Sequence, residues 1–228
     1  MTASSFSPVT TGEPGFCMST VPFTTLRSVA APLPEADVDT DILYPARFLV
    51  ITRKTGLAPC AFHDRRFDAA GRERPDFVLH RDPWRGAQIL VAGPNFGCGS
   101  SREQAPWALA DLGLRCLIAP GFGEIFEANC INNGLLPVTL PAAAHAQAMA
   151  AAEAGQAIEA DLPRNELRLQ DGTAIPFTLG QRQRQALLNG WDEIDRIRHE
   201  ESDAIAAFEK RQRAAQPWLY EPAETAGR

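Results

Sequence analysis

The amino-acid sequence predicts a layered α/β domain, with a mostly parallel sheet flanked by helices and a small antiparallel meander. Short strand patterns alternate with helical patterns between residues 87 and 140, as parallel crossover connections require. Three alternating segments separated by turns follow between residues 157 and 178, which is typical of a meander. Apolar residues make up 45% of the 228 residues, enough to bury a core.

The part of the chain before residue 87 is expected to form a tail, the start of the domain and a loop-rich region. Residues 1–22 are polar and lack both basic residues and a long apolar run, so we expect a flexible tail rather than a secretion signal. We hypothesise that translation starts at Met18, because the patterned sequence begins just after it. The domain is expected to span residues 23–190. Within it, residues 52–86 are charged and rich in Pro and Gly, which indicates loops over a core.

The region from residue 87 to residue 140 has the strongest pattern. Its apolar runs are typical of buried strands, and glycines at 113 and 134 follow the two helical patterns, where helices most readily end. The expected elements are a strand, a helix, a strand, a helix and a strand, at Gln88–Ala92, Glu103–Leu112, Cys116–Ala119, Gly123–Asn132 and Leu135–Leu140.

The remaining chain is expected to hold an Ala-rich helix, the meander and a helical tail. The helix is Ala142–Ala154, and the meander segments are Ala157–Asp161, Glu166–Gln170 and Ala174–Thr178. The tail over Gln181–Gln216 is expected to be helical, with apolar residues at roughly helical spacing at Ile194, Ile197, Ile205 and Phe208. We therefore predict that residues 191–228 form a C-terminal helix and tail that pack on the domain or on a partner.

Composition excludes several classes of function. Lys and Arg number 22 against 28 Asp and Glu, and this net charge of -6 argues against nucleic acid or an anionic membrane as a partner. The five cysteines are widely spaced without a C-x-x-C pair, so we expect no metal or cofactor to be bound by this chain. Free thiols and the lack of a transmembrane-length apolar run predict a cytoplasmic protein.

The Gly-rich segment Gly93–Glu103 is the main candidate site. It follows an expected strand and opens an expected helix, where unpaired backbone N–H groups and the helix dipole favour anions. Gly97 and Gly99 allow the backbone to approach a ligand, and Arg102 can hold a carboxylate through two parallel hydrogen bonds. The segment therefore predicts a site for a small carboxylic or phosphorylated anion.

Other interpretations of this segment are a nucleotide loop, a helix cap or a nucleophilic thiol. No Gly-Lys-Ser/Thr ends the loop, and Arg102 stands where a dinucleotide loop needs its third glycine. Capping of the helix by Ser100 or Ser101 remains an alternative. No histidine is placed to activate Cys98, so we expect that thiol to be structural.

A second feature is the acidic turn, which we define as residues 37–41. Its three aspartates repel one another, so their concentration indicates a cation, an orienting role for a base, or a solvated turn. The sequence alone leaves these alternatives open.

These motifs resemble the swivelling domain of the aconitase superfamily over about residues 23–210. The similarity rests on separate motifs in a common order, namely Val38–Asp41, Pro45–Leu49, Asn95–Glu103, Ala105–Leu109, Pro120–Phe126 and Asn133–Pro137. Leu187–Gly190 with Asp192–Ile194 resembles the end of the bacterial small-subunit family of isopropylmalate dehydratases. The chain departs from the common pattern at Gln104, where His is usual, and at Gly121–Glu124, where Ser-Phe-Ala-Asp is usual.

The resemblance implies a hydro-lyase that works as two subunits. Ser100 matches the base, Arg102 the residue that holds a substrate carboxylate, and Thr40 and Asp41 a segment bordering the same pocket. With Ser101 as a further substrate-binding residue and Gly97 and Gly99 shaping the loop backbone, these complete the expected site. A [4Fe–4S] cluster is expected on a partner large subunit, in a heterodimer or a higher assembly.

The expected substrate is a small hydroxy-dicarboxylate, 2-isopropylmalate, isomerised through 2-isopropylmaleate in leucine biosynthesis. Because an isopropyl group needs an apolar wall, we predict that Leu49 and Val50 help to select it. Two alternatives stay open. One is the small subunit of a related hydro-lyase acting on homocitrate, citraconate or a methylated maleate, and the other is a divergent, non-catalytic anion-binding module, which the change at Gln104 favours.

Overall fold

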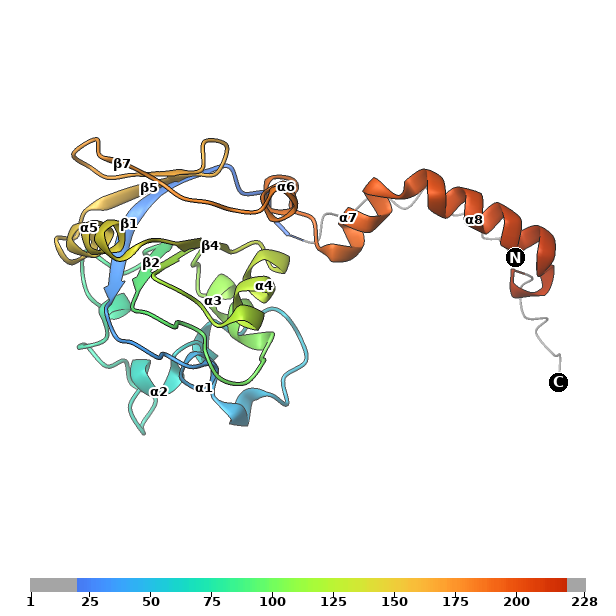
Figure 1. Cartoon of the computed structure of the whole chain (residues 1–228). Helices are drawn as coiled ribbons and strands as arrows, with labels where there is room; N and C mark the ends of the chain where they lie inside the picture. Colours follow the sequence, from blue (N-terminus) through green and yellow to red (C-terminus); the bar gives the residue numbers. More distant parts are fainter. Residues whose placement is uncertain (1–19, 221–228) are drawn as a thin grey trace, which may run out of the picture.

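A single curled sheet organises the chain. Figure 1 shows the computed structural model, which describes residues 20–220. The strands are β1 (Thr25–Leu33), β2 (Ile89–Ala92), β3 (Cys116–Ala119), β4 (Leu136–Thr139), β5 (Ala157–Asp161), β6 (Glu166–Arg168) and β7 (Ala174–Pro176). They form one seven-stranded sheet in the order β4-β3-β2-β1-β5-β6-β7.

Strand β1 joins the parallel and antiparallel parts of this sheet. Its second half pairs in parallel with β2, starting from Ala30 opposite Ile89, and β3 and β4 continue the parallel part. Its first half pairs antiparallel with β5, and β6 and β7 complete the meander. The layered α/β prediction is confirmed, and the parallel sheet and meander that we expected share one long strand.

Helices cover both faces of the parallel part. The α-helices are α1 (Thr40–Leu43), α2 (His63–Arg66), α3 (Gln104–Asp111), α4 (Glu124–Asn132), α5 (Ala142–Glu153), α6 (Gln181–Asn189), α7 (Glu193–Glu200) and α8 (Ser202–Ala215). Four short 3-10 turns are η1 (Ala46–Phe48), η2 (Ala58–Cys60), η3 (Val78–His80) and η4 (Pro217–Leu219). All five elements expected between residues 87 and 140 are present, and each end either matches the expected residue or differs from it by one.

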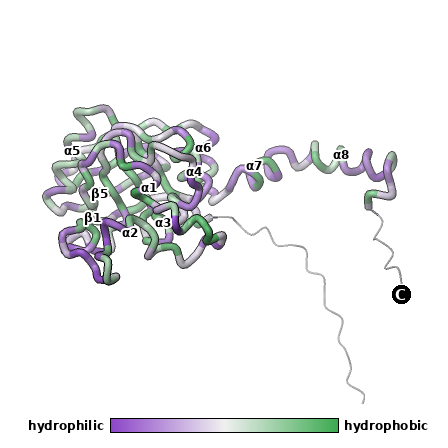
Figure 2. Tube along the Cα trace, turned by 90° about the horizontal axis from the view of Figure 1, so that it is seen from below, coloured by the Kyte–Doolittle hydropathy of each residue, from purple (hydrophilic) through white to green (hydrophobic). Residues whose placement is uncertain are grey.

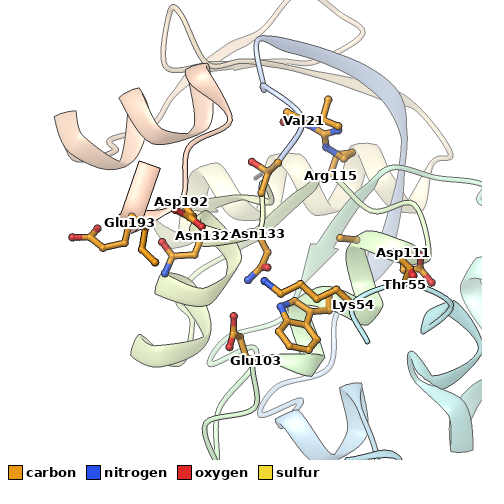
Figure 3. Close-up of a pocket in the computed structure, with 14 residues that line it drawn as sticks. Val21, Lys54, Thr55, Glu103, Asp111, Arg115, Asn132, Asn133, Asp192 and Glu193 are labelled. Carbon is orange, nitrogen blue, oxygen red and sulfur yellow. Dashed lines mark hydrogen bonds between the residues drawn. The ribbon is translucent and has the colours of Figure 1, made fainter. Parts of the chain in front are cut away.

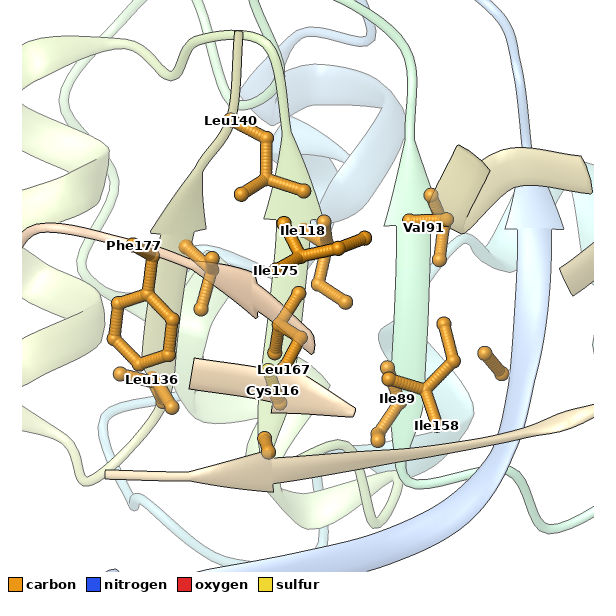
Figure 4. Close-up of a cluster of buried hydrophobic side chains, with 14 of the residues drawn as sticks. Ile89, Val91, Cys116, Ile118, Leu136, Leu140, Ile158, Leu167, Ile175 and Phe177 are labelled. Atoms are coloured by element: carbon orange, nitrogen blue, oxygen red, sulfur yellow. The ribbon is translucent and has the colours of Figure 1, made fainter. Parts of the chain in front are cut away.

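Two apolar clusters lie on opposite faces of the parallel strands, because successive strand residues point to opposite sides. In β2, Ile89 and Val91 belong to the cluster under the meander, α5 and α6, which Figure 4 shows. Leu90 and Ala92 belong to the cluster under α1 to α4. All four side chains are fully buried, and burying a large aliphatic side chain contributes about 1.5–3 kcal/mol. The two clusters fix the sheet edge at which the candidate loop emerges.

The loop-rich region after residue 52 also contributes to the core. Leu57 and Phe62 are fully buried and belong to the cluster under α1 to α4. The Asp111 carboxylate accepts hydrogen bonds from the backbone N–H groups of Leu57 and Ala58, at 2.6 and 2.7 Å. This contact attaches the loop region to the end of α3, so the charged segment covers the core as expected.

The prediction that Gln181–Gln216 is helical is confirmed, although the segment is not one continuous helix. The segment is three helices, and α6 ends at Gly190, whose φ of +68° favours glycine. A Cβ atom there would lie 2.3 Å from the carbonyl oxygen of Thr20, so the close approach of these two segments also requires glycine. Helices α7 and α8, which we call the arm (residues 193–215), extend away from the body (Figure 1).

Two further predictions concern the chain ends and membranes. The proposed flexible tail falls almost entirely outside the described residues, as do the Met18 start and the last eight residues. Within residues 20–220, no helix is both long and apolar enough to cross a membrane.

Candidate active site

The candidate loop and the acidic turn lie against each other. The backbone N–H of Gly97 donates to the carbonyl of Val38 at 2.7 Å, and the N–H of Thr40 donates to the carbonyl of Cys98 at 3.0 Å. The Asn95 side-chain amide also donates to the Asp37 carboxylate at 2.7 Å. Two segments almost sixty residues apart in sequence therefore form one rigid unit at the carboxyl end of β2.

Glycines permit this close packing. Gly97 has a φ of +73°, and a Cβ atom there would lie 2.3 Å from the ring of Phe126. A Cβ atom at Gly123 would lie 2.5 Å from the carbonyl oxygen of Gly97. The aromatic ring of Phe96, fully buried, packs edge-on against Phe126 at 5.6 Å. The loop thus follows the start of α4 as closely as its backbone allows.

Thr40 holds the loop at Ser100. Its hydroxyl donates a hydrogen bond to the carbonyl oxygen of Ser100 at 2.7 Å, and Thr40 is only 2% exposed. Asp39 caps α1 by accepting a hydrogen bond from the N–H of Ile42 at 2.8 Å, which places Thr40 as the first helical residue. The acidic turn therefore has a structural role that the sequence left open, because it positions the loop that carries Ser100.

The loop presents unpaired backbone donors. None of the four backbone N–H groups from Gly99 to Arg102 donates a hydrogen bond to any other group within residues 20–220. Ser100 and Ser101 are exposed, and Gly99 has a φ of +88°. Successive free N–H groups in a turn of this kind form a concave anion site. The alternative in which Ser100 or Ser101 caps the helix is wrong, because α3 begins after Glu103 without a side-chain cap.

Arg102 and Asp41 form a two-pronged ion pair. Both terminal nitrogens of the guanidinium contact the carboxylate, with Nη2 2.8 Å from Oδ2 and Nη1 in contact with Oδ1. Nη1 also donates to the carbonyl of Tyr44 at 3.1 Å. Nε makes no hydrogen bond within the described chain, and only 12% of the Arg102 side chain is exposed. One edge of the guanidinium is thus fixed by Asp41, and the Nε edge retains donors.

Most of the predicted residues line one hollow of about 190 Å³. It is lined by Thr40, Gly97, Gly99, Ser100, Ser101 and Arg102, together with Gly123, Glu124, Ile125 and Phe126. The structure therefore brings six predicted residues together. Asp41 takes part through its ion pair with Arg102 rather than as a lining residue.

The predicted apolar residues lie elsewhere. Leu49 and Val50 follow η1, are 37% and 85% exposed, and do not line this hollow. The apolar side chain that does line it is Ile125, which is 55% exposed at the start of α4. Sequence reasoning missed Ile125, although its place two residues after Gly123 in a recognised motif was an available signal.

Cys98 lies in the loop but is not set up as a nucleophile. Partial burial and the nearby charges of Asp37 and Asp39 raise the pKa of its thiol, which keeps it protonated at neutral pH. No group of three or more His, Cys, Asp or Glu side chains that could hold a metal ion occurs within residues 20–220. The structural interpretation of Cys98 agrees with this geometry.

Comparison with known proteins identifies relatives along most of the chain. The family model of the aconitase C-terminal domain matches residues 20–143, and that of the C-terminal domain of the 3-isopropylmalate dehydratase small subunit matches residues 200–221. The 3-isopropylmalate dehydratase small subunit of Rhodospirillum centenum is 50% identical over 198 residues, covering 86% of this chain and 97% of the relative. That of Parvibaculum lavamentivorans is 47% identical over 199 residues, covering 86% and 98%.

A solved structure is also similar. The 3-isopropylmalate dehydratase (leuD) of Methanocaldococcus jannaschii superimposes with a TM-score of 0.59 at 28% identity. The match covers 80% of this chain and 99% of the archaeal chain. The likeness therefore extends to the fold as well as to the sequence.

Proposed function

Because the chain belongs to the family of 3-isopropylmalate dehydratase small subunits, we propose that it supplies the base and the carboxylate-binding groups that interconvert 2-isopropylmalate and 3-isopropylmalate. The chain is one subunit of a hydro-lyase and acts with a large subunit. We place this reaction in the cytoplasm as a step of leucine biosynthesis, with 2-isopropylmaleate as its unsaturated intermediate.

The observation that carries the proposal is the environment of Ser100. Its exposed side chain lies in the hollow beside a row of unpaired backbone N–H groups and the guanidinium of Arg102. A serine hydroxyl is a poor base unless donors stabilise its ionised form, and these groups are such donors. Ser100 Oγ then takes a proton from the carbon next to a carboxylate, the C–H electrons form the double bond, and hydroxide leaves the neighbouring carbon. In rehydration, hydroxide adds to the carbon that lost the proton, and the proton adds to the carbon that lost hydroxide.

Arg102 can hold a substrate carboxylate without releasing Asp41. Asp41 occupies the edge formed by Nη1 and Nη2, whereas the N–H of Nε and the second hydrogen of Nη2 form another two-donor edge. We propose that this second edge binds the substrate carboxylate next to the abstracted proton. Asp41 is then an orienting residue that keeps the guanidinium plane fixed, and Ser101 adds a hydroxyl donor beside it.

The residues of this chain do not fit an iron–sulfur cluster. Its four described cysteines lie on separate elements, and Cys60, Cys116 and Cys130 are buried. We therefore propose that a [4Fe–4S] cluster belongs to the large subunit, where its iron would act as a Lewis acid toward the departing hydroxyl. The part of this chain is to hold the carboxylate and to move the proton.

The apolar group of the substrate needs an apolar wall. We propose that Leu49 and Val50 provide part of it once the site is closed by the large subunit, and that Ile125 provides the part lining the hollow. The high exposure of Val50, 85%, is consistent with a surface that is covered only in the assembled enzyme.

The test is an anaerobic assay in which the full chain is mixed with a cluster-loaded large subunit and 2-isopropylmalate, followed by ultraviolet absorbance of the unsaturated intermediate. Activity should require both chains. Ser100→Ala should lower kcat at least about 100-fold, as loss of a general base does, without weakening assembly. The matched Ser101→Ala variant should raise KM more than it lowers kcat. Normal kcat for Ser100→Ala would refute the assignment of the base.

Substrate choice is tested separately. Val50→Arg should lower kcat/KM for 2-isopropylmalate about 10- to 100-fold, since an apolar contact of this size discriminates by roughly that factor. Thr52→Arg, on the same exposed segment, is the control and should have little effect. If another hydroxy-diacid is converted and isopropylmalate is not, the proposed mechanism stands and the proposed substrate is wrong. No turnover of any of them would favour an anion-binding module.

A further inference from the structure

A second, larger hollow lies between the candidate loop and the start of α7, where the arm leaves the body. Its volume is about 560 Å³, and Figure 3 shows its lining residues. At one end it reaches Glu103, the residue directly after Arg102, and at the other it reaches Asp192 and Ile194 at the start of α7. Lys54 and Trp107 also line it, with the Lys54 ammonium 4.8 Å from the centre of the indole ring.

Helix α4 makes a second connection between the same two places. Ile125 lines the active-site hollow, whereas Ala128 and Asn132 line a further hollow of about 240 Å³ that is shared with the start of α7. All three residues are exposed, and their spacing of three and four places them on one helix face. Two sets of neighbouring residues, Arg102 with Glu103 and the exposed face of α4, therefore connect the active-site hollow with the start of the arm.

The arm itself lacks the packing that helices of its length need. No residue of α8 is buried, and its main contacts are with α7 and η4. An isolated helix of about 12–15 residues is marginal in water, and α8 has 14 residues. Figure 2 shows hydrophobic and hydrophilic residues alternating along the arm. Its exposed apolar residues include Ile194 (65%), Ile197 (41%), Ile205 (36%) and Phe208 (53%).

The larger hollow also holds donors without acceptors. Trp107 Nε1 and Arg115 Nε are buried and make no hydrogen bond within the described chain. Both residues line the hollow, and an unpaired buried donor is unfavourable until an acceptor reaches it. The lining side chains would have to move on docking before polar atoms of another chain could accept from these two donors.

We propose that the arm and the hollow at its root are a docking surface for the large subunit. The inference rests on the proposed function, because the large subunit must cover the active-site hollow, and the neighbouring residues Arg102 and Glu103 line that hollow and the larger hollow at the start of the arm. The family comparisons support it, since the aconitase match ends at residue 143, whereas residues 200–221 match a model specific to these small subunits. The apolar face of the arm gains its missing packing on the partner.

The experiment compares two double variants of the full chain in binding the large subunit. Ile205→Ser/Phe208→Ser removes the apolar face of α8, and Asp203→Ser/Lys210→Ser changes the opposite face of the same helix. Since α8 buries nothing in the free chain, both variants should keep the thermal stability of the body. We expect Ile205→Ser/Phe208→Ser to raise the dissociation constant at least about tenfold, as loss of an interface hot spot does. Asp203→Ser/Lys210→Ser should change it less than about twofold.

Activity separates this proposal from the proposed function. At a saturating concentration of the small subunit, Ile205→Ser/Phe208→Ser should recover a kcat within about twofold of the unmodified chain. An unmodified pair that binds but does not convert isopropylmalate would count against the proposed function only. An unmodified pair that is active, with an unchanged dissociation constant in the apolar variant, would overturn the docking surface. So would sedimentation showing that the chain alone dimerises and that the same variant abolishes the dimer.

Discussion

The hydrogen bond from Thr40 to the carbonyl of Ser100 offers a sharp test of how the loop is held. Thr40→Val keeps the shape of the buried side chain and removes only the donor, which lies 2.7 Å from the carbonyl oxygen. Thr40→Ser keeps the donor and removes a methyl group. The two variants therefore separate the contribution of the hydrogen bond from that of packing.

The expected losses of stability are similar for the two variants. A neutral hydrogen bond contributes about 0.5–1.5 kcal/mol net, and because Ser100 is exposed, water can partly replace the lost donor. A buried methyl group contributes about 0.8 kcal/mol. Each variant should thus lose about 1 kcal/mol, which corresponds to a fall in Tm of about 2–4 °C for a chain of this size.

The expected losses of activity differ strongly. A shift of about 1 Å in a catalytic group can lower the rate about 100-fold, and Thr40→Val releases Ser100, the residue that we propose as the base. Its kcat, measured with saturating large subunit and 2-isopropylmalate, should fall about 10- to 100-fold, whereas Thr40→Ser should stay within about threefold of the unmodified enzyme. Equal activity in the two variants would refute the positioning role of this hydrogen bond.

Two further predictions concern the same loop. Gly97→Ala should destabilise the chain by about 2–5 kcal/mol in urea unfolding, because a positive φ and contact with the Phe126 ring both disfavour a Cβ atom. Gly113→Ala is the control, because Gly113 has a φ of +104° but an added Cβ atom would meet nothing within 4 Å. It should lose only the part of the unfolding free energy that the positive φ accounts for. Because its pKa is raised, Cys98 should react with iodoacetamide at pH 8 more slowly than a free cysteine, and faster as pH rises, measured by mass spectrometry. A rate that levels off below pH 8 would contradict the raised pKa.

The fold was predictable where short-range pattern and burial agree. Short apolar runs, helical patterns and the glycines after α3 and α4 located every element from residue 89 to residue 139. The helical tail after Gln181 was predicted, but its division was not: α6 ends at the left-handed residue Gly190, which packs against Thr20, a residue 170 positions away in sequence. Similarly, β1 unites the parallel sheet with the meander through pairings that no local pattern encodes.

The sequence predicted most of the residues that form the candidate site, but not the contacts that hold them in place. Motifs placed Ser100 and Arg102 in one loop, and resemblance added Thr40 and Asp41. The structure shows that Asp41 holds Arg102 and that Thr40 holds the backbone of Ser100, contacts across about sixty residues that depend on the close approach at Gly97. The motif containing Ile125 was recognised, but its exposure at the hollow follows from how α4 packs on the loop and was therefore missed.

The exposure of the site gives this chain a reason to need a partner in addition to the cluster that we propose for the large subunit. Ser100, Ser101 and Ile125 are all open to solvent in the free chain. In water, unpaired amides and a guanidinium stabilise an alkoxide far less than in a closed site of low dielectric, because solvent screens the charges. The donors that we assign to the base therefore act with full strength only once the large subunit excludes water from the hollow. A surface that binds that subunit firmly, beginning beside Glu103 and continuing along the arm, would then contribute to catalysis as well as to assembly.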